Sequence, residues 1–344
     1  MERQPFAIGD AQVAPGERRL VNLPMSALAN RTPMSLPVCV IHGKRAGPTL
    51  FVSAAIHGDE LTGVAICRRL LASKALKVNT GTLLVVPIVN AFGFIAHSRY
   101  LPDRRDLNRS FPGSPRGSLA AQLAHIFLTQ VVARSTCGID LHSAAIHRAN
   151  LPQIRVDSHR ADALGLAEAF GAPIIVHSAL REGSLRATAQ GLGVPVLVYE
   201  GGEGLRVDEF SVEVGMQGVL RVMAHLGMIA KLRGKPPVTV LSTASRWVRA
   251  TESGLFRPYR EIGDHVVAGE RIGIVADPYG ESESDLKASC AGIVIGRANI
   301  PAINQGDALF HIARVENASQ LGEHYDRLEK EFDTERMLDE DEIL

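Results

Sequence analysis

The chain has 344 residues, of which 46% are hydrophobic, and its formal net charge is zero. This length predicts two domains, or one large domain with an appendage. No apolar run reaches the roughly 20 residues that span a bilayer, and the polar N-terminus lacks the apolar core of a signal peptide. We therefore expect a cytoplasmic protein that does not associate with membranes.

Charge is unevenly distributed along the chain. Residues 323–344 contain ten acidic and three basic residues, a net charge of −7, so residues 1–322 carry +7. A mildly basic body suits a small anionic substrate, but it lacks the clustered basic and aromatic residues that are typical of nucleic-acid binders. We expect no nucleic-acid partner. The charge distribution does not decide between a monomer and a homo-oligomer.

Apolar runs of strand length alternate with helical patterns from about residue 49 to residue 230. Five runs are apolar on both faces, as in strands buried on both sides, and they lie at 49–56, 82–89, 137–142, 173–177 and 194–199. Apolar residues at helical spacing predict helices at 60–73, 118–135 and 160–171. This alternation predicts an α/β domain with a largely parallel sheet.

The pattern changes at RGKPP (233–237). After it, short strand-like pieces alternate with glycine turns, which is typical of a small β-barrel or sandwich. We expect an α/β domain over 1–237 that starts with an N-terminal β extension over 1–45. A small β domain at 238–316 and an acidic tail at 317–344 would follow.

The stretch AIHGDELTG (55–63) places a histidine and two acids where a buried strand ends and a helix is predicted to begin. In doubly wound folds, sites form beyond the carboxyl ends of strands. His57 and Glu60 are one helical turn apart, and imidazole and carboxylate are ligands that zinc takes. The pattern is weak alone, because Asp59 or Glu60 could simply favour the helix dipole.

A third ligand should lie at another strand end. In CGIDLHSA (137–144), His142 closes a predicted strand, and Asp140 could orient a ligand histidine. A hydrogen-bonded histidine at a strand edge is the alternative. Together with His57 and Glu60, this pattern favours a zinc site.

Two further stretches carry candidate site residues. RYLPDRRDLNRSFPG (99–113) contains Asn108 and Arg109, and an arginine beside an amide donor is suited to bind a carboxylate. In VPVLVYEGGEG (194–204), Glu200 ends a buried strand and could act as a general base, with Glu203 as the competing candidate. The alternative for 99–113 is a solvated basic loop, and the alternative for Glu200 is an acidic residue in a turn.

HGDE, DLNRSFPG, DLHS and YEGG, in this order, resemble the succinylglutamate desuccinylase/aspartoacylase family of the zinc carboxypeptidase-like superfamily. The resemblance spans roughly 45–230. It implies a doubly wound mixed sheet with helices on both faces, followed by a smaller C-terminal β domain, with the catalytic domain within 1–237. The residues that it implies as ligands of one zinc ion per chain are His57, Glu60 and His142.

The resemblance also implies roles in substrate binding and catalysis. Asn108 and Arg109 would bind the substrate carboxylate, and Glu200 would be the base. In the family, an arginine upstream of the DLNR-like motif polarises the scissile carbonyl, and Arg99 matches by type. The other candidates for that role are Arg104 and Arg105. Arg186, in GSLRATA, is the candidate for a further substrate-binding arginine.

The implied activity is that of a zinc-dependent amidohydrolase acting on carbon–nitrogen bonds other than peptide bonds. It would remove the acyl group of a small anionic N-acyl amino acid, using zinc-activated water and a glutamate base. A zinc carboxypeptidase that acts on a short peptide would use the same groups. A non-enzymatic binding protein on the same fold is the third reading.

Overall fold

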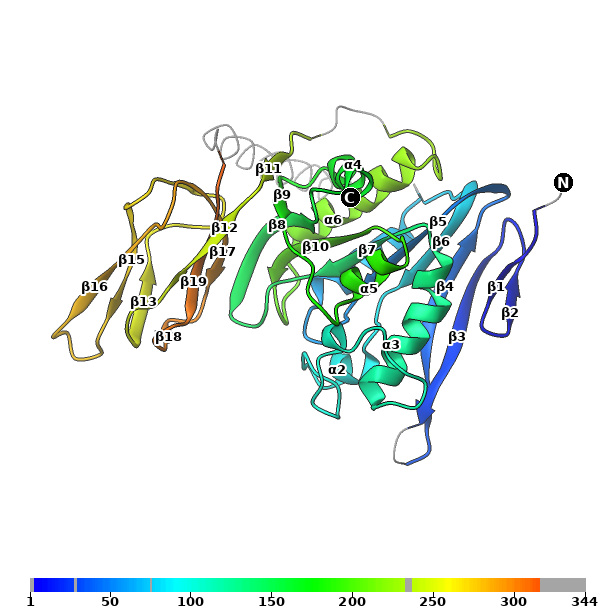
Figure 1. Cartoon of the computed structure of the whole chain (residues 1–344), viewed down its shortest axis with the longest axis horizontal. Coiled ribbons are helices and arrows are strands. Elements are labelled where there is room, and N and C mark those ends of the chain that lie inside the picture. The colour runs from blue at the N-terminus through cyan, green and yellow to red at the C-terminus, as the bar shows by residue number, and fades with distance from the viewer. Residues whose placement is uncertain (1–2, 28–29, 75, 233–236, 316–344) are drawn as a thin grey trace, which may run out of the picture.

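The structure is a computed structural model that describes residues 3–27, 30–74, 76–232 and 237–315. A 13-stranded mixed sheet runs through it (Figure 1). Its main path, in spatial order, is β12 (Ser245–Arg249), β19 (Ala308–Ala313), β17 (Gly292–Ala298), β8 (Arg148–Val156), β10 (Val196–Glu203), β7 (Cys137–His142), β5 (Arg45–Ala54), β6 (Thr80–Val86), β4 (Pro33–His42) and β3 (Arg18–Ala27). The expected tail at 317–344 lies outside the described residues.

The centre of the sheet is parallel, as the alternating pattern predicted. β6, β5, β7 and β10 are parallel neighbours, whereas β4 and β8 flank them in antiparallel orientation. The five predicted strands correspond to β5, β6, β7, β9 (Ile174–His177) and β10. Because the central strands are parallel, their carboxyl ends meet at one edge of the sheet.

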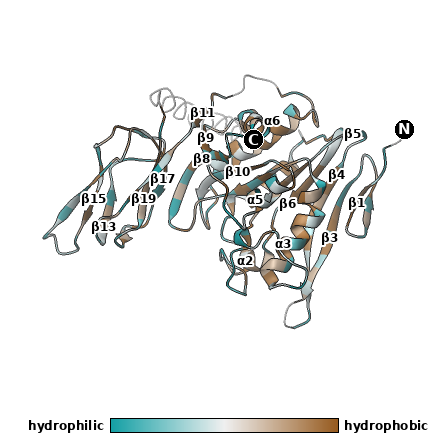
Figure 2. Ribbon diagram, viewed as in Figure 1, coloured by the Kyte–Doolittle hydropathy of each residue, from teal (hydrophilic) through white to brown (hydrophobic). Residues whose placement is uncertain are grey.

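Helices cover both faces of the sheet (Figure 1). One face carries α1 (Thr62–Ala72), α4 (Ala161–Phe170) and α6 (Glu209–His225), and the other carries α2 (Ala91–Ile95), α3 (Leu119–Gln130) and α5 (Leu185–Gly191). Short 3-10 turns, η1 (Leu107–Arg109) and η2 (Val132–Arg134), flank α3 in sequence. Hydrophobic residues concentrate between these layers (Figure 2). In the described residues, no helix is both long and apolar enough to cross a membrane.

Strand β8 was not predicted, and Pro152 explains why. A proline argues against a strand in the middle of a sheet because it has no N–H to donate. The pairing of β8 with β10 shifts register between Gln153 and Asn150, so a bulge accommodates the proline. On its other side, β8 pairs with β9 after this point and with β17 before it.

The C-terminal strands continue the large sheet and add a second one. β11 (Val240–Ser242) pairs with β9, and β14 (His265–Val266) pairs with β17. A four-stranded sheet has the order β16 (Glu283–Lys287), β15 (Arg271–Ala276), β13 (Gly254–Pro258) and β18 (Ala302–Ile303). The two sheets share one hydrophobic core, in which Phe256 meets Phe310 edge to face at 5.5 Å. At the other end of the chain, β1 (Phe6–Ile8) and β2 (Ala11–Val13) form a hairpin.

Candidate active site

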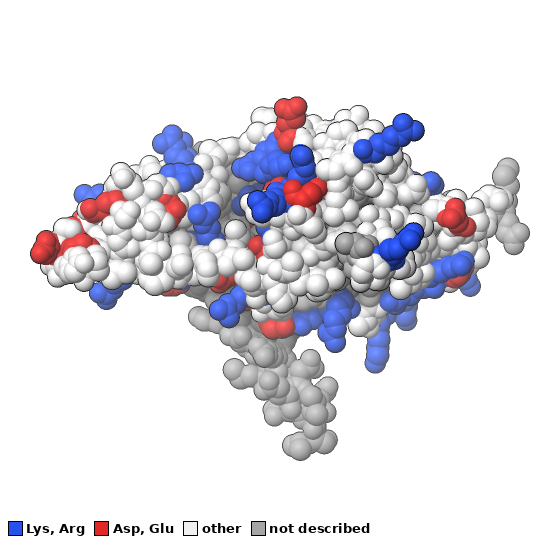
Figure 3. All heavy atoms as spheres, turned by 90° about the horizontal axis from the view of Figure 1, so that it is seen from below, with Lys and Arg blue, Asp and Glu red and all other residues white. Residues whose placement is uncertain are grey.

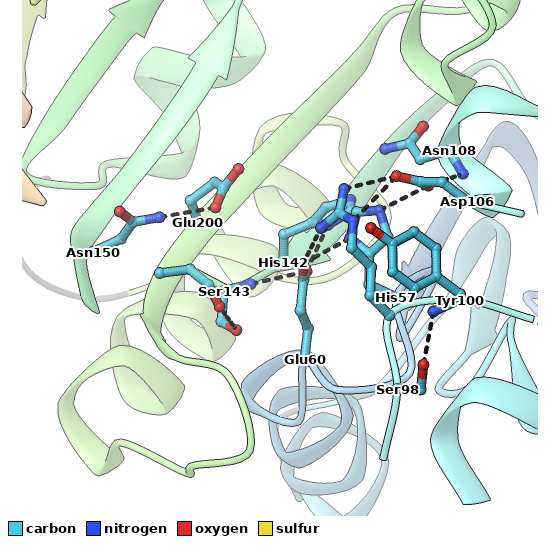
Figure 4. A network of polar contacts seen from close by, with 12 residues as sticks. His57, Glu60, Ser98, Tyr100, Asp106, Asn108, His142, Ser143, Asn150 and Glu200 are labelled. Atoms are coloured by element: carbon cyan, nitrogen blue, oxygen red, sulfur yellow. Dashed lines mark hydrogen bonds and ion pairs between the residues drawn. The ribbon is translucent and has the colours of Figure 1, made fainter. Parts of the chain in front are cut away.

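Three potential metal ligands meet at the carboxyl ends of β5 and β7 (Figure 4). His57 and Glu60 follow β5, and His142 is the last residue of β7. Oε1 of Glu60 is 2.6 Å from Nδ1 of His57, and its Oε2 is 2.7 Å from Nδ1 of His142. All three residues are buried, and one ligand atom from each lies within 4.8 Å of the others. This arrangement could hold one metal ion.

A tight turn, rather than the predicted helix, positions His57 and Glu60. Helix α1 begins only at Thr62, and the backbone N–H of Glu60 donates to the His57 carbonyl at 3.2 Å. A Cβ on Gly58 would lie 1.9 Å from the carbonyl carbon of Gly93, so only glycine lets the turn lie against α2. The first turn of α1 contains no acidic residue, and both oxygens of Glu60 face the two imidazoles instead.

A second carboxylate holds the far side of each imidazole. Nε2 of His57 lies 3.2 Å from Oδ1 of Asp106, and Nε2 of His142 lies 2.7 Å from Oδ2 of Asp140. Such partners orient a ligand histidine and fix its proton on the nitrogen that faces away from the metal. Asp140 therefore has the position that its place in CGIDLHSA suggested.

Positive and negative charge are strongly coupled in this cluster. Burial disfavours charge on each group, but the carboxylates of Glu60 and Asp106 outweigh burial and raise the pKa of His57. Burial likewise opposes charge on His142, yet Asp140 and Glu60 raise its pKa well above its usual value. Burial would raise the pKa of Glu60, but the two imidazoles hold it well below its usual range. The cluster thus favours positive charge between its carboxylates.

The donor set fits a zinc ion. Both imidazoles face carboxylate oxygens on both sides, so without a metal each ring needs two protons to satisfy them. A cation among the Nδ1 atoms and the Glu60 carboxylate would supply the same charge while the rings stay neutral. Two imidazoles and one carboxylate also form a common ligand set of catalytic zinc.

Asp106 connects the basic loop to this cluster. Its Oδ2 accepts hydrogen bonds from Nε and Nη2 of Arg99 at 3.1 and 2.9 Å, and Nη1 of Arg99 lies 3.5 Å from Glu60. The structure therefore brings Arg99 to the cluster and fixes its guanidinium. Arg104 and Arg105, the alternatives for its role, are not among the described residues that line the pocket.

Asn108 and Arg109 lie on the 3-10 turn η1, next to the cluster. The side chain of Asp106 accepts from the backbone N–H of Asn108 at 2.8 Å and so caps the turn. Oδ1 of Asn108 accepts from the backbone N–H of Leu185 at 2.9 Å, which leaves the amide nitrogen to donate elsewhere. Both Asn108 and Arg109 line the pocket.

Glu200 lies beside His142 in the sheet. The two residues are direct partners in the parallel pairing of β10 with β7, so their side chains point to the same face. Oε2 of Glu200 accepts from Nδ2 of Asn150 at 3.0 Å, and Oε1 lies 3.3 Å from Nη1 of Arg155. These two partners, both on β8, hold the carboxylate at the pocket, and Figure 4 shows the contact with Asn150.

Glu203, the competing base candidate, has a different position. It is not among the described residues that line the pocket. Its Oε1 accepts from the backbone N–H of His147 at 3.1 Å, and its Oε2 accepts from Nδ2 of Asn299 at 2.9 Å. Since Asn299 follows β17, Glu203 connects the loop after β7 to the C-terminal strands.

The pocket in front of the cluster has a volume of about 310 Å³ and is rich in arginine. Space-filling atoms show basic side chains gathered around a hollow in the middle of the molecule (Figure 3). Trp247 on β12 lines the pocket too, so the C-terminal strands contribute to its wall. The arginines that line it are Arg99, Arg109, Arg148, Arg155, Arg181 and Arg186.

Arg186 reaches the pocket as the sequence suggested, but part of its guanidinium is already bound. Nη2 donates to the carbonyls of Ser178 and Ala179 at 3.0 and 2.9 Å, whereas Nη1 is buried and has no hydrogen-bond partner among the described residues. Burial, followed by the charge of Arg155, lowers the pKa of Arg186 to about 10, so it stays cationic at neutral pH.

Sequence reasoning missed several residues of the site. Arg155 and Asn150 were missed together with β8, the strand that carries them. Asp106 stood in the quoted DLNR motif, and its position as an aspartate before a short turn was the available signal. Trp247 carried no local signal, because the fold alone brings it to the pocket.

A second group of potential ligands lies outside this pocket. Asp157, His159 and His177 each offer one atom within 4.8 Å of the others, and His159 is exposed. Nδ1 of His177 already interacts with the hydroxyl of Ser158 at 2.9 Å. None of the three is among the described residues that line the pocket, and we assign the group no role in the reaction.

Comparison with known proteins shows the family to which the chain belongs. The profile of the succinylglutamate desuccinylase/aspartoacylase catalytic domain matches residues 46–226. An N-alpha-acetyl-L-2,4-diaminobutyric acid deacetylase from Halomonas elongata is 29% identical over 297 residues, which cover 81% of this chain and 86% of the relative.

Two solved structures share the fold over most of their length. A succinylglutamate desuccinylase/aspartoacylase from Rhodobacter sphaeroides matches with a TM-score of 0.77 and 27% identity, covering 87% of this chain and 95% of its own. The product-bound ectoine utilization protein EutE (DoeB) from Ruegeria pomeroyi matches with a TM-score of 0.80 and 26% identity, covering 91% of this chain and all of its own. The chain belongs to the succinylglutamate desuccinylase/aspartoacylase family.

Proposed function

We propose that this protein is a zinc-dependent amidohydrolase that removes the acyl group from a small N-acyl amino acid. The convergence of His57, Glu60 and His142 in front of Glu200 carries the proposal, because it combines a zinc ligand set with an adjacent carboxylate in one small pocket. The Halomonas relative is named as a deacetylase of an N-acetylated amino acid, which supports the same reaction class.

Zinc held by these three residues would act as a Lewis acid and would lower the pKa of a bound water toward neutrality. Glu200 then has the role of general base and acid: it accepts a proton from the attacking water and delivers it to the nitrogen of the leaving amine. Asn150 and Arg155 keep its carboxylate beside His142 during both transfers.

The basic loop would orient the substrate. Nη1 of Arg109 already donates to the carbonyl of Asn108. The remaining guanidinium nitrogens, together with the Asn108 amide nitrogen, which donates to none of the described residues, can bind the α-carboxylate. Arg99, held by Asp106 next to Glu60, can donate to the amide carbonyl oxygen as negative charge develops there.

Pocket size favours a deacylase over a carboxypeptidase that acts on long peptides. A volume of about 310 Å³ is at the small end of ligand pockets and suits a single acylated amino acid. Trp247 lines one wall of the pocket. A short peptide remains the competing substrate, and the assay must include it.

The test is hydrolysis by the zinc-loaded protein. N-acetyl and N-succinyl amino acids, their α-carboxamides and a set of dipeptides are incubated with the protein, and the released primary amine is quantified. We expect release from N-acyl amino acids and loss of activity on the carboxamides. Cleavage of dipeptides alone would establish a carboxypeptidase, and no release from any compound would leave a binding protein.

A further inference from the structure

The proposed reaction does not use the carboxylate of Glu203. This residue ends β10, three residues after Glu200, and its two oxygens bind distant parts of the chain. Oε1 accepts from the backbone N–H of His147 at 3.1 Å, and Oε2 accepts from Nδ2 of Asn299 at 2.9 Å. His147 lies in the loop that follows His142. Glu203 therefore joins the loop after a proposed zinc ligand to the C-terminal strands.

This loop, residues 143–147 between β7 and β8, forms the pocket wall next to the proposed zinc ligands. Ser143, Ala144 and Ala145 line the pocket. The backbone N–H of Ser143 also donates to Oε2 of Glu60 at 3.2 Å (Figure 4). A shift of the β7–β8 loop would therefore move both a wall of the pocket and a hydrogen-bond donor to Glu60.

His147 has a backbone conformation that is uncommon for a residue other than glycine. Its φ is 65°, in the left-handed region. Both of its backbone polar groups are bound, because its N–H donates to Glu203 and its carbonyl accepts from the backbone N–H of Asn299 at 2.8 Å. An unfavourable conformation of this kind persists where surrounding contacts fix it. Glu203 and Asn299 supply such contacts.

The residues that follow Glu203 contact both segments that carry proposed zinc ligands. The backbone N–H of Leu205 donates at 2.7 Å to the carbonyl of Asp59, in the turn of the HGDE motif. A Cβ on Gly204 would lie 2.8 Å from the backbone nitrogen of Ile146, so the β7–β8 loop packs directly against the end of β10. The end of β10 thus supports the motif turn and the loop together.

Asn299 is itself held by the C-terminal strands. Its Oδ1 accepts from Nη2 of Arg297 at 3.4 Å, and Nη1 of Arg297 lies 2.5 Å from Oε2 of Glu261. Strand β17, which ends one residue before Asn299, pairs with the start of β8 through Ala298 and Arg148. The position of Asn299 against the loop is therefore fixed by its side chain and by the sheet.

We infer that Glu203 and Asn299 form a clamp that holds the β7–β8 loop in its active conformation, with Glu203 as a positioning residue for the reaction. Through this clamp, the C-terminal strands stabilise the wall of the active site. The inference rests on the proposed deacylase function. The competing role for Glu203 is that of the general base, and the variants below separate the two roles.

Removing the carboxylate should loosen the loop and leave the metal bound. In Glu203→Ala, kcat for an N-acyl amino acid should fall by about 10- to 100-fold, the effect of a displacement of about 1 Å near a reacting centre. KM should change little, because Asn108 and Arg109 lie on η1, away from the clamp. Glu168→Ala is the matched control, because Glu168 is exposed on α4 and is not among the described residues that line the pocket. Wild-type kcat in Glu203→Ala would contradict the inference.

An exchanged pair tests the contact itself. Glu203→Gln leaves one oxygen to accept from His147 but turns a donor toward the donor of Asn299, so kcat should fall. In Glu203→Gln/Asn299→Asp, the new amide can donate to the new carboxylate, and most of kcat should return. This recovery would also exclude Glu203 as the base, because an amide cannot accept the proton. A double variant no more active than Glu203→Gln would refute the clamp.

Hydrogen exchange tests the clamp without a substrate. The amide of His147 donates to Glu203, so it should exchange about 10- to 100-fold faster in Glu203→Ala, as expected for loss of a hydrogen bond to a charged group. Glu168→Ala should leave this rate unchanged. Faster exchange in a protein that hydrolyses none of the compounds would support the clamp and show that the proposed function is wrong for them. Unchanged exchange in a folded Glu203→Ala protein would overturn the inference at any level of activity.

Discussion

Asp140 offers a sharp test of how the site holds a metal, because it touches a proposed ligand without being one. The residue is 1% exposed, and its two oxygens accept from Nε2 of His142 and from the hydroxyl of Ser53, each at 2.7 Å. Asp140→Asn keeps the shape of the side chain but removes its charge. The amide still offers one oxygen to His142, and the hydroxyl of Ser53 can turn to accept from its nitrogen.

The expected loss follows from this change. A hydrogen bond to a carboxylate is about twice as strong as one to a neutral acceptor, so His142 becomes a poorer ligand and is held less firmly. Loss of such a partner lowers metal affinity by about 10- to 100-fold, or about 1.4 to 2.8 kcal/mol. The zinc dissociation constant should rise by that factor in competition with a chromophoric chelator.

Two controls make the result interpretable. Asp10→Asn changes an exposed carboxylate at the β1–β2 turn and should leave zinc affinity unchanged. The melting temperature of metal-free Asp140→Asn shows whether the buried substitution has unfolded the protein. A folded Asp140→Asn protein with wild-type zinc affinity would refute the account of His142 as an oriented ligand.

Three further predictions concern catalysis, binding and stability. Glu200→Gln keeps its size but cannot accept a proton, so kcat should fall by about 10² or more while zinc stays bound; full activity would exclude Glu200 as the base. Arg109→Lys should raise KM, because an ammonium cannot form the guanidinium fork, with metal content unchanged as the control. Burial, followed by the charge of Arg155, lowers the pKa of His311 from its usual value of 6.5 to about 3. Between these two pH values, the imidazole is therefore protonated in the unfolded chain but neutral in the folded protein. Stability should therefore decline as pH falls through this window, by up to about 1.4 kcal/mol per pH unit, and His311→Phe should flatten the decline in denaturant titrations.

The cluster of His57, Glu60 and His142 could be predicted because its signals are local and the topology is regular. His57 and His142 each follow an apolar run, and parallel strands bring their carboxyl ends to one edge of the sheet. The start of α1 was placed too early, at residue 60, because the apolar periodicity does not show that a turn precedes Thr62.

The rest of the pocket depends on contacts that no short stretch of sequence shows. Because Pro152 argues against a strand, β8 was not predicted. The two arginines that β8 carries to the pocket, Arg148 and the Glu200 partner Arg155, were therefore missed as well. Trp247 reaches the pocket because β17 pairs with β8 and carries β19 and β12 with it. Such long-range pairing is a property of the whole sheet.

Metal content of the purified protein tests the central claim most directly. We expect about one zinc per chain, as for a single three-ligand site, and loss of most of it in both His57→Ala and His142→Ala. His159→Ala, in the second histidine group, is the matched control and should keep its zinc. Wild-type zinc content in His57→Ala and His142→Ala, or loss of zinc only in His159→Ala, would contradict the account.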